Sequence, residues 1–235
     1  MKSTLGDLAG SVAKNARLLP LRAARLGTAA WQAVVHGPAA PLPGETVHVD
    51  PRHIRGHVTP ELRAHLLRRT GHPGGVVVGG DWDRTVARYE DFTEKVVYRS
   101  CHARWVEGRD WEDTPLVQVY LERLATGVPC RFPTVEHLRQ RYAALDRIFA
   151  EATEQRRLSS RHEDLVRISV TRDHGLLWGP DGRHRVSIAL IAGLTTIPAR
   201  VGFIHPHALP YFQTLRVARP APRLRLALPG ARRGA

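Results

Sequence analysis

Residues 179–198 read GPDGRHRVSIALIAGLTTIP, and this stretch says most about how the chain folds. It holds a glycine-bearing turn and then an apolar helix, predicted over 186–192 with Gly193 as its C-cap. A strand predicted over 197–201 follows. Backbone N–H groups at the start of such a helix carry partial positive charge and bind anions. The order of turn and helix therefore predicts an anion site at the turn.

The side chains of this turn agree with that prediction. His184 and Arg185 add donors, and arginine suits two-pronged contact with phosphate. Gly182 permits a positive φ or a close backbone approach. The alternative is structural: Asp181 caps the helix and Arg185 pairs with an acidic side chain. The candidate phosphate-binding residues are Asp181, Gly182, Arg183, His184 and Arg185.

The turn 181–185, the apolar helix and the strand resemble the signature of the ParB/sulfiredoxin-like superfamily, whose members carry a D-G-x-H-R type turn, a short helix ending in glycine and an IPV strand. The resemblance covers about residues 164–202 and extends more weakly to VHVDPRHI at 47–54. It implies an α+β fold, with a small mixed sheet and an added helical layer. It also implies a pocket for ATP or another nucleotide at the turn.

Members of that superfamily include chromosome-partition proteins that bind DNA and CTP, sulfiredoxins that use ATP, free-serine kinases and proposed nucleases. Sulfiredoxins place their catalytic cysteine directly before the His–Arg pair, where this chain has Arg183. Neither Cys101 nor Cys130 lies in such a motif, so sulfinic-acid repair is not expected. Partition proteins continue into a helix-turn-helix and a dimerisation domain, whereas residues 206–235 are a Pro- and Arg-rich tail. With these two roles set aside, the resemblance still implies a nucleotide or phosphate pocket at the turn.

A second cluster, Asp81–Trp82–Asp83, follows a short strand predicted over 76–78. Two carboxylates on such a loop can hold Mg²⁺ while substrate phosphates complete its shell. One aspartate could instead act as a general base toward an acceptor hydroxyl. The alternative is a loop whose aspartates bond their own backbone while Trp82 packs. Asp81 and Asp83 are therefore the candidate catalytic and metal-binding residues of a phosphotransferase that acts on a small hydroxyl substrate.

The net charge of +13 lies mainly at the two ends of the chain. Residues 1–44 carry +4 and residues 203–235 carry +6, which leaves +3 for the body. Basic tails suit the phosphates of DNA or RNA. The second hypothesis is therefore a nucleic-acid-binding protein or nuclease that uses these tails.

Residues 1–40 are predicted to be a basic helical extension and linker. One helical face of this extension is apolar; its members are Leu5, Leu8, Val12, Ala16 and Leu19. Small basic helices with an aromatic residue, here Trp31, can lie on anionic membranes. The third hypothesis is therefore a membrane-surface or partner-docking protein that acts through residues 1–35. No apolar run approaches a membrane span, and two cysteines without a CxxC motif favour a reducing compartment, so we expect a cytoplasmic protein, peripheral to the membrane at most.

Between the ends, residues 45–205 are predicted to be the ParB/sulfiredoxin-like domain, with a helical insertion at about 84–160, and the Pro- and Arg-rich tail at 206–235 is predicted to be extended or disordered. Thr-Pro pairs predict helix starts at Pro60 and Pro115, and Thr134 caps a longer helix. The inner stripe of that longer helix is Leu138, Tyr142, Leu145, Phe149 and Ala152. A hairpin is predicted at 166–178 and an edge strand at 46–49.

Overall fold

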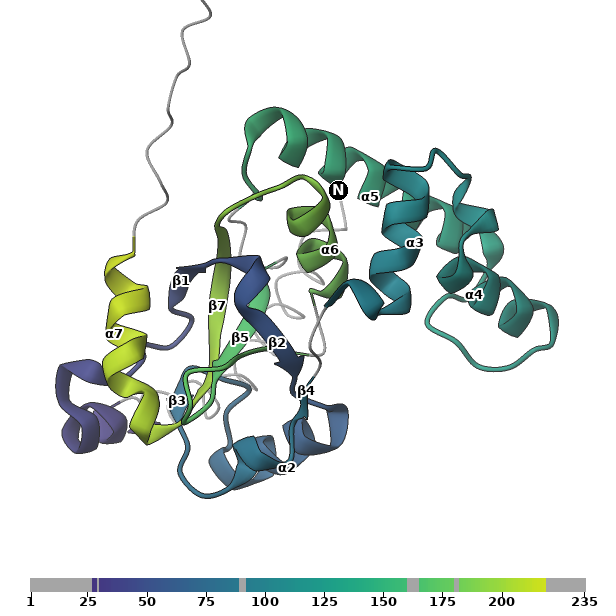
Figure 1. Cartoon of the computed structure of the whole chain (residues 1–235). Coiled ribbons are helices and arrows are strands. Elements are labelled where there is room, and N and C mark those ends of the chain that lie inside the picture. The colour runs from purple at the N-terminus through teal and green to yellow at the C-terminus, as the bar shows by residue number, and fades with distance from the viewer. Residues whose placement is uncertain (1–26, 29, 89–91, 160–164, 180–181, 219–235) are drawn as a thin grey trace, which may run out of the picture.

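The computed structural model describes residues 27–218 apart from 29, 89–91, 160–164 and 180–181. Within these residues a mixed sheet carries helices around it, which confirms the predicted α+β class (Figure 1). The apolar face predicted at residues 5–19 and the basic residues after 218 lie outside the described part of the chain. None of the described helices is both long and apolar enough to cross a membrane.

The sheet has the order β1-β7-β5-β6-β2-β4, with β3 beside the far end of β7. β5 runs parallel to β7 and antiparallel to β6, and β1 lies at the predicted edge. β7 is three residues longer than predicted because Phe203 and Ile204 pair with β3. The strands are β1 (Thr46–Val49), β2 (Ile54–His57), β3 (Val76–Val77), β4 (Ala87–Arg88), β5 (Val166–Val170), β6 (Leu176–Trp178) and β7 (Ile197–Ile204).

The predicted helix starts are confirmed, and threonine caps show the cause at two of the three. The Oγ1 atoms of Thr59 and Thr134 accept the backbone N–H groups of Leu62 and His137, respectively, as N-cap side chains do. The helices are α2 (Pro60–Thr70), α3 (Val96–Trp105), α4 (Pro115–Ala125), α5 (Val135–Gln155), α6 (Arg183–Ile191) and α7 (Leu209–Val217).

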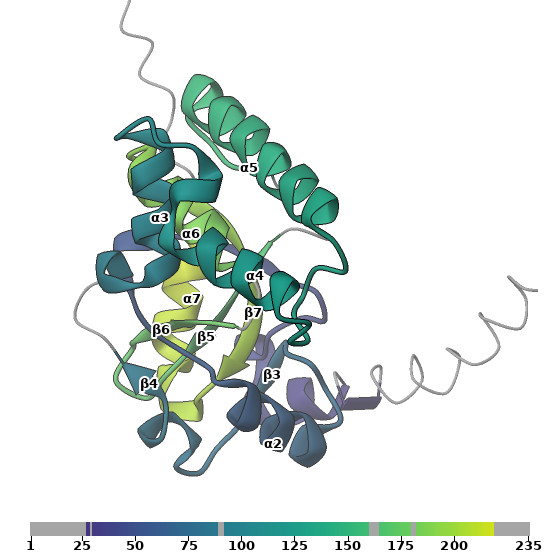
Figure 2. The ribbon, with the colours of Figure 1, turned by 90° about the vertical axis from the view of Figure 1, so that its right-hand side faces the viewer.

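The segment predicted as a helical insertion contains α3, α4 and α5, and these helices form a layer against α6 (Figures 1 and 2). α5 is the outer member of the layer in Figure 2. The predicted stripe of α5 faces inward: four of its members are buried and Phe149 is half-buried. The layer and the sheet share one apolar core, so α6 is packed on both sides.

The prediction of an extended chain from residue 206 is wrong for 209–217, which form α7. Phe212 and Leu215 are buried there, and α7 packs on β1, so tertiary packing stabilises a helix whose pattern is too short to recognise. Arg216 of α7 also pairs with Glu45 and donates to the carbonyl oxygen of Pro38. The predicted linker is thus fastened to the body of the protein.

Candidate functional site

The start of α6 is shaped by Gly182, which is its N-cap residue. Its φ is 101°, a conformation that favours glycine, and an added Cβ would lie 3.0 Å from the Cα of Val166. The helix therefore begins at Arg183, three residues earlier than predicted, and His184 and Arg185 lie in its first turn. No side chain caps the helix at Gly182 among the described residues. Asp181, the predicted capping or binding residue, lies outside the described residues.

The two arginines of this turn reach in different directions. Arg183 donates from Nη2 to the hydroxyl oxygen of Tyr120 on α4, at 2.9 Å. Arg185 is buried and donates from Nη1 to the carbonyl oxygen of Ser159, at 3.4 Å. The turn is thus held between the helical layer and the chain that leads into β5. Of the predicted residues, the structure places Gly182, Arg183, His184 and Arg185 together.

His184 is the most unusual group of this turn. Its side chain is only 7% exposed, and its Nε2 atom is buried with no hydrogen-bond partner in the described part of the chain. Its ring meets the ring of Tyr142 edge-on, with the centroids 5.9 Å apart. Burial, together with the charges of Arg183, Arg141 and Arg131, lowers the pKa of His184 to about 3. The imidazole is therefore neutral at physiological pH.

Three guanidinium groups thus act on one buried imidazole. They come from the loop before α5 (Arg131), from α5 itself (Arg141) and from α6 (Arg183). Sequence reasoning missed Arg131 and Arg141, because neither belongs to a motif. It also placed Tyr142 in an apolar stripe without asking where its hydroxyl goes. The hydroxyl group of Tyr142, on the buried face of α5, is the signal that could have led to the surroundings of His184.

In the second predicted cluster, Asp81–Trp82–Asp83, the carboxylate of Asp83 forms an ion pair with Arg172. Asp83 is 1% exposed, and Arg172 donates to it from the backbone N–H at 2.8 Å and from Nη2 at 2.7 Å. Burial alone would raise the pKa of Asp83, but the hydrogen bonds from Arg172 hold it below its usual value. Asp81 is exposed and pairs with Arg172 and with Arg84. Trp82 is buried and donates to the carbonyl oxygen of Val78, as the packing alternative expected.

The two predicted parts of the site lie at opposite ends of β5. Gly182 lies against Val166, the first residue of the strand, whereas the partner of Asp83 is Arg172, just beyond its last residue. At about 3.3 Å per residue, β5 itself spans roughly 13 Å from Val166 to Val170, and Arg172 lies in the turn beyond it. The structure therefore does not bring Asp81 and Asp83 to the start of α6.

Asp83 does not fit the role of a magnesium ligand in this arrangement. Both of its carboxylate oxygens accept hydrogen bonds from Arg172, so a cation would have to displace a guanidinium group. The described residues contain no group of three or more His, Cys, Asp or Glu side chains placed to hold a metal ion. What the α6 end offers instead is a set of donors, which suits an anion.

The chain matches no protein-family model, no curated protein and no solved structure. The resemblance to the ParB/sulfiredoxin-like superfamily accordingly stays an expectation that rests on the motif at 181–201. The function has to be inferred from the residues of the site and their geometry.

Proposed function

We propose that the protein binds a phosphate-bearing ligand, either a nucleotide or a phosphorylated small molecule, at the start of α6. The observation that carries the proposal is the buried Nε2 atom of His184, which lacks a partner in the described part of the chain. Leaving a buried polar atom unpaired costs about 1–3 kcal/mol, so it suggests a missing partner. A phosphate oxygen can supply that partner.

The charges around His184 favour an anion over a neutral ligand. The charged groups that shift its pKa are arginines, and the first turn of α6 adds the positive end of a helix dipole. In its Nε2–H tautomer the neutral imidazole donates from Nε2 without first taking up a proton. Arg183 stands beside it in the same turn and offers a planar fork to phosphate. These groups together resemble the phosphate sites found at other helix starts.

The proposal concerns binding and assigns no catalytic step. Phosphoryl transfer requires a base or a metal-held nucleophile close to the phosphate, and the candidates for both, Asp81 and Asp83, lie at the other end of β5. The nucleic-acid hypothesis depends on the basic ends, 1–44 and 203–235, and the membrane hypothesis on residues 1–35. Both stay predictions, because residues 1–26 and 219–235 of these segments lie outside the described part of the chain.

Calorimetry with ATP, CTP, ADP and pyrophosphate, each with and without Mg²⁺, tests the proposal on the full chain. We expect at least one of these probes to bind, and the Arg183→Gln variant to bind it at least about tenfold more weakly. Arg68→Gln is the matched control. Arg68 is exposed on α2, so its substitution removes the same charge away from the motif. Absence of binding by every probe would refute the proposal. An equal loss in both variants would show only non-specific attraction to a basic protein.

A further inference from the structure

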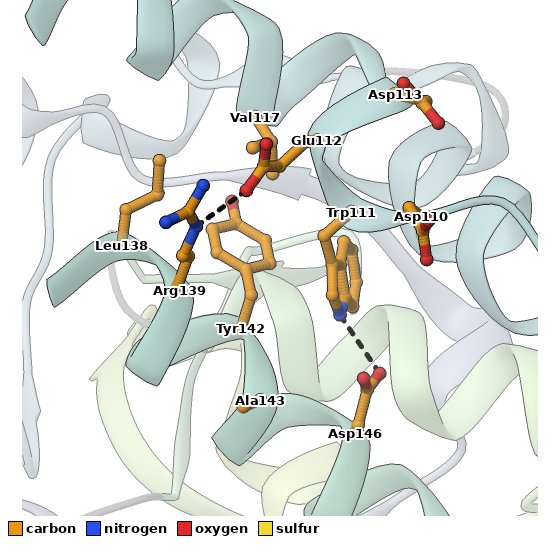
Figure 3. Close-up of a pocket in the computed structure, with 10 residues that line it drawn as sticks. All are labelled: Asp110, Trp111, Glu112, Asp113, Val117, Leu138, Arg139, Tyr142, Ala143 and Asp146. Carbon is orange, nitrogen blue, oxygen red and sulfur yellow. Dashed lines mark hydrogen bonds and ion pairs between the residues drawn. The ribbon is translucent and has the colours of Figure 1, made fainter. Parts of the chain in front are cut away.

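A cavity of about 460 Å³ opens within the helical layer (Figure 3), and one of its lining residues, Tyr142, also contacts His184 at the start of α6. It lies among α4, α5 and the short turn η5 (Trp111–Asp113). Its size falls within the usual range of small-molecule sites. The lining residues are Asp110, Trp111, Glu112, Asp113, Val117, Leu138, Arg139, Tyr142, Ala143 and Asp146.

The lining is acidic although the protein as a whole carries a charge of +13. Asp146 is held in place by Arg104 and by the indole N–H groups of Trp105 and Trp111, at 2.8 and 3.0 Å respectively. Two other lining carboxylates pair with arginines: Asp110 with Arg104, and Glu112 with Arg139. Asp113 adds a carboxylate that makes no ion pair within the described residues. The lining itself therefore holds four carboxylates and one arginine, Arg139, and is negative, although the charges of Arg141 and Arg183 also act on Tyr142.

Aromatic rings form part of the wall. The rings of Trp111 and Tyr142 have centroids 4.6 Å apart, and Trp105 meets Trp111 edge-on at 5.5 Å. Figure 3 shows Trp111 and Tyr142 standing beside each other between Glu112 and Asp146. The face of an aromatic ring attracts cations, most strongly for tryptophan. The carboxylates and the aromatic rings of the lining thus both favour a positively charged ligand.

A third observation is independent of the acidic side chains. The Tyr142 side chain is 2% exposed, and its hydroxyl has no hydrogen-bond partner in the described part of the chain. In Figure 3 the hydroxyl points toward Glu112 and Val117, among the lining residues. Burial also raises the pKa of Tyr142, so the hydroxyl keeps its proton and can either donate or accept. The cavity therefore offers a polar contact that nothing described in the chain uses.

We propose that this cavity binds a small organic cation, an ammonium compound that also carries a hydroxyl or another polar group for Tyr142. The carboxylates neutralise the ammonium charge, the indole ring of Trp111 contacts its methyl or methylene groups, and Tyr142 supplies the hydroxyl contact. A bare metal ion fits poorly, because aromatic and aliphatic side chains make up much of the lining and metal ions need several converging oxygen ligands.

The test compares choline with its neutral isostere 3,3-dimethylbutan-1-ol, which keeps the shape and hydroxyl but lacks the charge. Titration of the full chain is followed by calorimetry and by tryptophan fluorescence, since Trp111 lines the cavity. We expect choline to bind saturably and the isostere to bind at least about tenfold more weakly. Equal binding of the two compounds, or no saturable binding of choline or ethanolamine, would overturn the proposal.

Variants locate the site. Asp113→Asn should weaken choline binding several-fold, whereas Glu151→Gln, which removes an exposed charge from α5 outside the lining, should leave it unchanged. Tyr142→Phe should weaken binding while the melting temperature stays the same or rises, because the substitution removes a buried hydroxyl without a described partner. A Tyr142→Phe variant that binds choline normally would place the cation elsewhere.

Discussion

The two ends of β5 both bring arginines next to a buried polar group, yet they differ in what that group finds. At the far end Arg172 meets the carboxylate of Asp83 and donates to both of its oxygens. At the near end the buried group is the neutral imidazole of His184, and its Nε2 atom has no partner in the described part of the chain. The first arrangement is fully paired within the protein, whereas the second leaves a buried polar atom for the proposed ligand.

The comparison shows why charge alone is a poor guide to function. Asp81 and Asp83 form the more familiar motif, but their charges are used to hold a loop to the β5–β6 turn. His184 carries no charge at neutral pH, yet its Nε2 atom has no hydrogen-bond partner in the described part of the chain. Buried polar groups are nearly always paired in proteins, so an unpaired one is the more informative observation.

The largest predicted loss of stability comes from breaking the ion pair between Asp83 and Arg172. Asp83→Asn should lower the free energy of unfolding by about 3 kcal/mol, because it removes the buried partner of an ion pair and leaves Arg172 with only the exposed carboxylate of Asp81 as its counter-charge. Urea denaturation at pH 7 measures this loss. If instead stability holds and a Mg²⁺-dependent activity disappears, Asp83 is a functional residue and the comparison fails.

The pH dependence of stability separates the two ends. The pKa of His184 is about 3 in the folded protein and about 6.5 in the unfolded chain, so the unfolded state binds more protons in this range. Stability should therefore fall as the pH is lowered from 6 to 4, by about 1.4 kcal/mol per unit from this residue. His184→Leu should remove that slope. Asp83, whose pKa is lowered, contributes fully above pH of about 4, and its contribution is lost only at lower pH.

A bound anion should change the pH dependence that His184 contributes to stability. A bound phosphate stabilises the protonated imidazole, so pyrophosphate or a nucleotide should raise the pKa of His184 and flatten the slope between pH 6 and 4. Denaturation with and without the probe measures this change. An unchanged slope at saturating probe would place the anion away from His184.

A smaller effect is expected at the turn that presents the imidazole. Gly182→Ala should cost about 1–2 kcal/mol, because its φ of 101° is unfavourable for other residues and the new Cβ would press on Val166. Anion binding should weaken as well, since the first turn of α6 would shift. Gly108→Ala is a matched control, because Gly108 also has a positive φ but an added Cβ there would meet nothing. A similar loss of stability in both variants would mean that backbone strain alone matters at Gly182.

Much of the fold follows from local signals in the sequence. Threonine caps, the period of α5 and the alternation of β5 act over a few residues, so they predict their elements well. α7 was missed because its stability comes from packing on β1, a contact that no short window contains. The same limit applies to the site. The motif at 182–185 was predicted, but its neighbours Arg131, Arg141 and Tyr142 arrive through the packing of α5 on α6.

The smallest effect on stability should accompany the largest effect on binding. At pH 7, His184→Leu removes a buried nitrogen without a described partner and keeps a similar volume, so the free energy of unfolding should change by less than about 1 kcal/mol. Anion binding should nevertheless be lost, because Nε2 and its place in the first turn of α6 are gone. Paired denaturation and calorimetry on this variant measure both quantities. A stable variant that binds as well as the wild type would make the unpaired imidazole a packing feature. A strongly destabilised variant would show that Nε2 already has a partner within the protein, and the two ends of β5 would then be alike.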